Sequence, residues 1–219
     1  MFSSHNITRN LNKFPQNLKP LIATSFTSTR LFSSTIPIMT RVSEALKTDH
    51  RELEDAYNKI LSATSEDEKT RWQNQFIWEL ARHSIGEELV VYPAMEKYLN
   101  NGKEMADKDR KDHAKVKEQL YKFQNLKATD ADFEPTIKAL MSDLSQHIKE
   151  EEEHDLVALE NALKEDDSED LYKSFNRSKM FAPTRSHPSA PDKPPFETAA
   201  GLLAAPIDHL KDLFSRFPK

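Results

Sequence analysis

The chain has 219 residues, enough for one well-packed domain of ordinary size with extensions. Charged residues make up 31%, three residues are glycine and none is cysteine, so the composition favours long solvated helices and excludes disulfides, thiolate catalysis, zinc ribbons and iron–sulfur ligation. The formal net charge of −5 gives no reason to expect nucleic acid as a partner, and no apolar run approaches the roughly 18 residues that a transmembrane segment needs.

The first 43 residues are basic and rich in Ser and Thr, and they contain neither Asp nor Glu. Their positive charges are Arg9, Lys13, Lys19, Arg30 and Arg41. This composition is typical of a mitochondrial transit peptide, so we predict one over residues 1–38 and a mature protein in the matrix. A disordered N-terminal arm is the alternative, and a start at Met39 would instead give a cytoplasmic form.

Four segments between residues 40 and 165 carry apolar side chains at every third or fourth position. They begin near residues 40, 65, 103 and 132, and the last ends near residue 164. This period is that of amphipathic helices and the links are short, so residues 40–165 are predicted to form an all-α, up-down-up-down four-helix bundle. Pro93 lacks a backbone donor and is expected to bend the second helix.

Residues 166–219 are predicted to form a tail. Seven of the twelve prolines fall from Pro183 onward, which favours an extended, polyproline-like segment along the surface. A short amphipathic helix is expected at the end of the chain, with an apolar side formed by Leu203, Ile207, Leu210, Phe214 and Phe217. We expect this side to pack against the bundle, and docking to a membrane surface or a partner is the alternative.

Two helices of the predicted bundle carry the same polar pair. His83 is followed four residues later by Glu87, and His147 is followed at the same distance by Glu151. Residues four apart lie on one face of a helix, so each pair directs an imidazole and a carboxylate towards one point.

An Asp-His dipeptide precedes each pair at a matching distance. Asp49-His50 lies before the first pair and Asp112-His113 before the second, and both histidines fall within the apolar stripes of their helices. The two halves are offset by about 64 residues, which indicates a duplicated helix-turn-helix unit.

Four histidines and two glutamates at one level of a small bundle are costly to bury. An unpaired carboxylate in a core costs several kcal/mol, and a buried histidine loses either its charge or a hydrogen bond. A pair of divalent cations removes this cost, because each carboxylate can bridge two metals while imidazoles fill terminal positions. A ligand set of nitrogen and oxygen without sulfur suits iron, which we predict, or manganese, with zinc as a further candidate.

Over residues 40–165 these motifs resemble the hemerythrin-like family, whose members are also called HHE cation-binding domains. The tail sequence TRSHPSAPDKPPFETAAGLLAAPID is similar to segments that follow the domain in fungal members. The resemblance implies two iron ions in a non-haem di-iron centre, bridged by carboxylates and an oxo or hydroxo group. The implied metal ligands are His50, His83, Glu87, His113, His147 and Glu151.

One position departs from the oxygen-carrying members of that family, which have a second histidine one turn after the first on the third helix. Here that position is Lys117. The sequence is therefore more similar to iron- or redox-responsive members than to reversible dioxygen carriers. His154, two turns after His147, is a candidate for the missing ligand or for a supporting position beside the metal.

Further carboxylates flank the expected ligands. Glu88 and Glu152 follow the bridging residues and are alternative ligands, although adjacent residues point to different sides of a helix. Asp49 and Asp112 are candidates to accept a hydrogen bond from a histidine on the neighbouring helix and so fix its tautomer, with simple exposure to solvent as the alternative.

The sequence is compatible with three functions. The first is a di-iron protein that senses, buffers or reacts with iron, dioxygen, nitric oxide or peroxide. The second is a di-iron oxidoreductase that activates dioxygen or reduces peroxide, and the third is an interaction module whose tail engages a partner when iron is bound. A ferritin-like oxidase is disfavoured because it needs two Glu-x-x-His pairs, and within the predicted bundle only Glu151 with His154 fits.

Overall fold

The computed structural model describes residues 40–189 and 196–219, with only the backbone for residues 196–203. The predicted transit peptide at residues 1–38 and part of the proline-rich segment lie outside the described residues. Every regular element in the described part of the compact unit Ile38–Lys219 is helical, so the predicted all-α class is confirmed. Within these described ranges, no helix is both long and apolar enough to cross a membrane.

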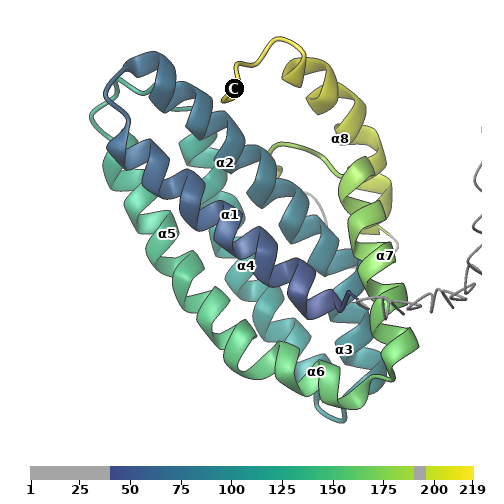
Figure 1. The fold of residues 1–219 in the computed structure, drawn as a ribbon. Helices are drawn as coiled ribbons and strands as arrows, with labels where there is room; N and C mark the ends of the chain where they lie inside the picture. The colour runs from purple at the N-terminus through teal and green to yellow at the C-terminus, as the bar shows by residue number, and fades with distance from the viewer. Residues whose placement is uncertain (1–39, 190–195) are drawn as a thin grey trace, which may run out of the picture. The chain divides into compact units, whose positions relative to one another are not determined.

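Four long helices form the predicted up-down-up-down bundle (Figure 1). They are α1 (Val42–Ser62), α2 (Glu66–Gly86), α4 (Gly102–Gln124) and α5 (Phe133–Glu150). Helix α1 packs against α2 and α5, and α4 packs against the same two helices. The two helices that carry a single predicted histidine, α1 and α4, therefore lie diagonally across the bundle from each other.

Helices α2 and α5 change pitch at the same point of the repeat. Helix α2 continues through the π-helical turn η1 (Glu87–Val91) into α3 (Tyr92–Tyr98), and α5 continues through η2 (Glu151–Asp155) into α6 (Leu156–Ala162). In each turn a backbone N–H donates to the carbonyl five residues earlier, from Tyr92 to Glu87 and from Leu156 to Glu151. Such turns are rare and frequently occur at functional sites.

The distortion predicted at Pro93 begins before the proline. Pro93 lies in the first turn of α3, directly after η1, where its missing donor costs little. The second half of the repeat has Val157 at the equivalent position and still forms η2. The π turns therefore do not depend on proline.

Apolar side chains form two clusters along the bundle. One contains Leu53 and Phe123, and the other contains Leu46 and Phe175, all with no more than traces of exposed surface. His50 lies between Leu46 of one cluster and Leu53 of the other along α1. The histidines thus occupy a polar layer with an apolar cluster on either side, which limits the access of water.

Helix α7 (Glu165–Phe181) was not among the predicted elements. It packs against α1, α2 and η1. The ring of Phe175 lies so close to Gly86 that a Cβ at that position would come within 2.9 Å of two ring carbons. The hydroxyl of Ser168 accepts a hydrogen bond from the first free N–H of α1, at Val42, over 3.1 Å. Helix α7 therefore closes the side of the bundle next to the first π turn.

Helix α8 (Phe196–Asp212) packs against α7 near the C-terminus. The predicted packing of its apolar side on the bundle is wrong for Ile207, Leu210 and Phe214, which are 60%, 58% and 83% exposed. The buried side of the helix instead carries Asp208, which ion-pairs with a histidine of the preceding segment. Beyond the helix, the ring of Phe217 does contact an aromatic side chain of α2.

Candidate metal centre

The six residues predicted to bind metal lie together in the polar layer. Each is at most 4% exposed. They come from all four bundle helices and both π turns, namely His50 on α1, His83 on α2, Glu87 on η1, His113 on α4, His147 on α5 and Glu151 on η2. The equivalent residues of the two halves of the sequence thus form a single cluster in the folded protein.

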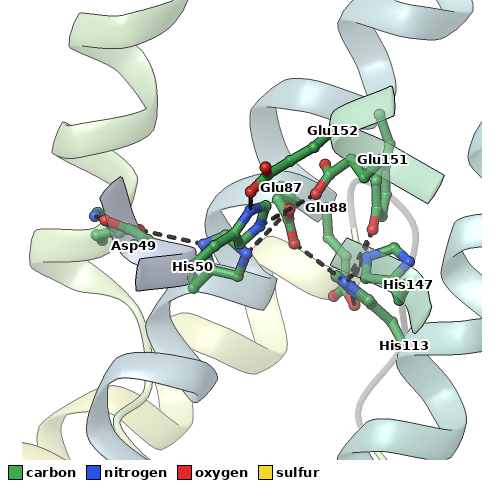
Figure 2. A network of polar contacts seen from close by, with 11 residues as sticks. Asp49, His50, Glu87, Glu88, His113, His147, Glu151 and Glu152 are labelled. Carbon is green, nitrogen blue, oxygen red and sulfur yellow. Dashed lines mark hydrogen bonds and ion pairs between the residues drawn. The ribbon is translucent and has the colours of Figure 1, made fainter. Parts of the chain in front are cut away.

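Glu87 connects the two sides of this cluster. Its Oε1 lies 3.1 Å from Nε2 of His83, and its Oε2 lies 3.1 Å from Nε2 of His113. Nε2 of His113 is also 3.2 Å from Nε2 of His147. Figure 2 shows Glu87 in the middle, with His50 on one side and the His113 and His147 pair on the other.

Glu151 faces the histidine of α1. Its Oε2 lies 3.2 Å from Nε2 of His50. The imidazoles themselves form two edge-to-face pairs, with ring centroids 4.9 Å apart for His50 and His83 and 4.8 Å apart for His113 and His147. Each half of the layer thus presents two imidazoles to a carboxylate.

Glu88 and Glu152 also face the site, although adjacent residues of an α-helix were expected to point to different sides. Nδ1 of His113 lies 3.3 Å from Oε1 of Glu88, and Nδ1 of His50 lies 2.7 Å from Oε1 of Glu152. Each of these two histidines is therefore contacted at Nε2 by the first glutamate of a pair and at Nδ1 by the second. This arrangement suits the second glutamates for orienting the imidazoles.

A cation at the rim balances each of these outer glutamates. Nζ of Lys117 lies 2.5 Å from Oε1 of Glu88, and Arg51 forms an ion pair with Glu152. Burial would raise the pKa of Glu88, but its contacts with His113 and Lys117 outweigh burial and lower it. Lys117 thus neutralises a carboxylate at the position where the oxygen carriers have a histidine.

The π turns determine which side chains reach the site beyond each bridging glutamate. The hydroxyl of the fully buried Tyr92 lies 3.0 Å from Nε2 of His113. After Glu151 the same shift in register buries Leu156 and leaves His154 exposed. We had not predicted Tyr92, and His154 points away from the cluster instead of supplying a ligand. The available signal lies in the second half, where the apolar residues Leu156 and Leu159 come one residue later than an α-helical period from Glu151 gives.

The carboxylates hold two of the histidines in their cationic form. Burial alone would lower the pKa of His83, but the charge of Glu87 and the hydrogen bond with Asp49 outweigh it and raise that pKa to about 10. Burial also opposes the charge on His113, yet Glu87 and Glu88 raise its pKa to about 9. In the absence of a metal ion, the protons on His83 and His113 supply the positive charge that a bound cation would bring to the carboxylates.

His147 and Glu151, which lie four residues apart at the junction of α5 and η2, favour their uncharged forms. Burial and the positive charge of His113 lower the pKa of His147 to about 3. Burial and the negative charge of Glu87 raise the pKa of Glu151 to about 7. His147 is therefore already neutral near pH 7, which is the form that binds a metal ion.

Several enclosed atoms in the layer make no well-directed hydrogen bond. They are both carboxylate oxygens of Glu87 and of Glu151, Nε2 of His50 and Nδ1 of His147. Buried polar atoms are normally paired, so these atoms call for a ligand. Two of the donor sets that fit a cation lie in this layer and share Glu87, each with its atoms within 4.8 Å of one another: His50, His83 and Glu87, and Glu87, His113 and His147. The residues thus fit metal ions at two adjacent positions that share Glu87.

Asp49 orients one of the histidines, as one of the two predicted alternatives requires. Its Oδ2 lies 3.2 Å from Nδ1 of His83, and Nζ of Lys179, on α7, lies 2.6 Å from the same carboxylate oxygen. Asp112, the counterpart of Asp49 in the repeat, pairs with Lys108 at 3.0 Å instead. Of the two Asp-His dipeptides, the first therefore places its aspartate against an imidazole of the layer, and the second does not.

Substitution of Asp49 by Asn is expected to weaken metal binding by about 10- to 100-fold, because Asn is a weaker acceptor for the Nδ1–H of His83. Competition with a chromophoric chelator for Co²⁺ measures the effect. Asp55→Asn is the control, since Asp55 is exposed on the same helix. Equal affinities of the two variants would contradict an orienting contact between Asp49 and His83.

A bundle of four helices around a buried layer of histidine and glutamate defines a class of cation-binding helical proteins. The family model for the hemerythrin HHE cation binding domain matches residues 41–159, and the chain belongs to this family.

Comparison with curated proteins gives a relative in Schizosaccharomyces pombe, the uncharacterized hemerythrin-like protein C869.06c. It is 54% identical over 204 residues, which cover 93% of this chain and 99% of the relative. An alignment of that length extends beyond residues 41–159, so the similarity is not confined to the bundle. No solved structure matches the chain.

Proposed function

We propose that the protein holds a dinuclear non-haem iron centre and uses it to sense, buffer or react with iron, dioxygen, nitric oxide or peroxide. The proposed ligands are His50, His83, Glu87, His113, His147 and Glu151. The observation that carries the proposal is that Glu87 belongs to two of the sets of donors that fit a cation. A carboxylate shared in this way suits a pair of ions better than one.

The chain's own residues prepare the site for cations. Glu87 and Glu151 supply negative charge, and His83 and His113 must each give up a proton when a metal ion binds. Asp49 holds the ring of His83 in place. Bound iron would supply redox chemistry and positions for a small ligand, and the apolar clusters on either side of the layer limit competing water.

Metal analysis of the protein purified from its native compartment tests this proposal. We expect about two iron ions per chain and, in the oxidised protein, the visible absorption of a bridged pair, as in other bundle di-iron proteins. His83→Ala and Glu151→Ala should lose both the iron and the absorption. Manganese or zinc in place of iron would change the metal but not the ligands, whereas no bound metal would contradict the centre.

A di-iron oxidoreductase is the second candidate, and the buried hydroxyl of Tyr92 favours it. This hydroxyl lies 3.0 Å from Nε2 of His113, so a proton donor is present inside an otherwise apolar wall. Peroxide consumption by the iron-loaded protein, compared with His83→Ala and Glu151→Ala, tests this activity. Turnover no faster than that of free iron would leave only the binding function.

An iron-dependent interaction module is the third candidate. The ion pair between Lys179 and Asp49 favours it, because it connects α7 to the carboxylate that holds His83. Limited proteolysis of residues 166–219 in the apo and metal-loaded protein tests the idea. Equal rates of cleavage would remove its support.

We also propose a mitochondrial location, on the basis of the basic, acid-free composition of residues 1–38. A fluorescent fusion and the N-terminal sequence of the mature protein test it. Translation from Met39 would instead give a cytoplasmic fusion protein.

A further inference from the structure

A surface pocket between α4 and α5 reaches one of the proposed ligands. Its volume is about 170 Å³, and His147 is part of its lining together with the more exposed Asp112, Asp143 and Glu150. His147 itself is only 4% exposed. The pocket therefore leads from solvent to the edge of the polar layer.

Asp112 and His147, which line this pocket, form a group of three donors with Asp109. Asp109 and Asp112 are three residues apart on α4, and one atom from each lies within 4.8 Å of the other and of a nitrogen of His147. Asp109 is 1% exposed, and its Oδ2 makes no hydrogen bond. Nδ1 of His147 also makes none. Both atoms are thus buried and unpaired, and neither Asp109 nor Asp112 is among the proposed ligands of the dinuclear centre.

The ammonium group of Lys108 already lies beside these carboxylates. Nζ of Lys108 is 2.6 Å from Glu150, 3.0 Å from Asp112 and 3.8 Å from Asp109. The lysine side chain is 53% exposed, and its flexible stem allows it to move aside. The ammonium marks the place where positive charge is favoured, and a divalent ion would compete for the same carboxylates.

Asp109 and His147 connect this group of donors to the polar layer. Asp109 lies close enough to Glu151 for the two carboxylates to repel each other electrostatically. His147 has its other nitrogen, Nε2, 3.2 Å from Nε2 of His113 inside the layer. Asp112, Asp109 and His147 therefore form a series from the surface to the ligands.

The repeat does not explain Asp109. His50 and His113 are equivalent in the two halves, and the residue equivalent to Asp109 in the first half is Leu46. Leu46 is fully buried in an apolar cluster. The buried carboxylate of Asp109 is therefore a feature of the second half and does not follow from the duplication of the proposed ligands.

We propose that Asp109, Asp112 and His147 form a third, transient site for a divalent cation, through which ions pass between the pocket and the dinuclear centre. The inference rests on the proposed function, because it needs a centre to load. Lys108 occupies the carboxylates until an ion arrives. His147 serves both sites, since its two ring nitrogens point in different directions.

Uptake of Co²⁺ by the full-length apo protein tests this site, with stopped-flow absorption as the measurement. Asp112→Asn is expected to slow uptake about ten-fold, because the amide replaces one of the three donors and removes its charge from the path of the cation. Release to a chelator should slow by the same factor, so the affinity and the spectrum of bound Co²⁺ stay unchanged. Lys108→Gln is expected to speed uptake.

Asp143→Asn is the matched control. It removes one negative charge from the same pocket, but Asp143 pairs with Lys115 at 2.7 Å and is outside the group of three donors. Uptake by this variant should stay within about two-fold of the wild type, because the charge of the pocket changes but the three donors do not. Equal slowing by the Asp143 and Asp112 variants would overturn the site and leave only a general charge effect.

Two other results would also overturn it. Uptake by Asp112→Asn at the wild-type rate would show that ions do not pass this carboxylate. Weaker binding with faster release would show that Asp112 merely holds a ligand in place. The proposed function fails separately, if the wild-type protein binds no Co²⁺ in the layer at all.

Discussion

Substitution of Glu87 by Gln is expected to remove metal from both positions of the centre. Glu87 contacts His83 and His113 through different oxygens, each at 3.1 Å, so one amide would disturb both sets of donors. Loss of a contact that only orients a ligand already weakens metal binding about 10- to 100-fold, and loss of a shared charged ligand should exceed that range. Metal content after dialysis and Co²⁺ titration measure the change.

Two further variants make this expectation specific. Glu79→Gln is the control, because Glu79 lies two turns earlier on α2 and pairs with Arg82 rather than with a histidine. Glu151→Gln should weaken binding less than Glu87→Gln, since Glu151 contacts His50 alone among the ligand histidines and already tends towards its neutral form. A Glu87→Gln protein that retains two ions would contradict the shared position of Glu87.

The positions of the six clustered residues were predictable because they depend on simple periods. A separation of four residues places His83 with Glu87, and His147 with Glu151, whatever the rest of the chain does. The offset between the halves then requires the two pairs to meet when α2 and α5 pack in one bundle. His50 and His113 could be added because each interrupts an apolar stripe.

The roles of the neighbouring residues could not be predicted, because they depend on the π turns. An α-helical period beyond Glu151 places His154 inside, whereas the observed turn exposes it and buries Leu156. The same change of pitch brings Tyr92 to His113. Since Pro93 has no counterpart in the second half, no local breaker residue marks both turns. Their common feature is the buried glutamate, Glu87 or Glu151, at which each begins.

Helix α7 was missed for a different reason. The prolines from Pro183 onward suggested an extended tail, and the segment before them is polar at its start, with Glu165, Asp166 and Asp167. These acids suit the N-terminal turn of a helix. Its link to the site, from Lys179 to Asp49, joins residues 130 positions apart and leaves no local signal in the sequence.

The stability of the apo protein is expected to fall as the pH rises from about 6.5 to 9, whereas metal binding should become stronger. The pKa of His83 is raised to about 10 and that of His113 to about 9, so the stability that their charges provide is complete below the unfolded value of 6.5 and is lost as the pH passes through the folded values. Each such proton contributes a slope of up to about 1.4 kcal/mol per pH unit.

Two buried acids act in the same direction. The pKa of Glu151 is raised to about 7, chiefly by burial and by Glu87, and that of Asp109 to about 8, chiefly by burial and by Asp155. A raised pKa of an acid means that the folded state holds its proton longer than the unfolded state. Stability from these protonated forms is therefore also lost as the pH rises, from the unfolded pKa values of 4.5 and 3.8 up to the folded values of about 7 and 8.

Metal ions reverse this dependence, because they replace the protons of His83 and His113 with positive charge that does not titrate away. The difference in melting temperature between loaded and apo protein should thus widen from pH 6.5 to pH 9. His83→Gln is the informative variant, because Asp49 keeps Lys179 as a partner and the loss of one raised pKa should flatten the apo slope. His154→Gln, at an exposed position, should leave the slope unchanged. An apo melting temperature that stays level or rises over this range would show that the layer does not store protons in the absence of a cation, and the electrostatic argument for a metal at this level of the bundle would fail with it.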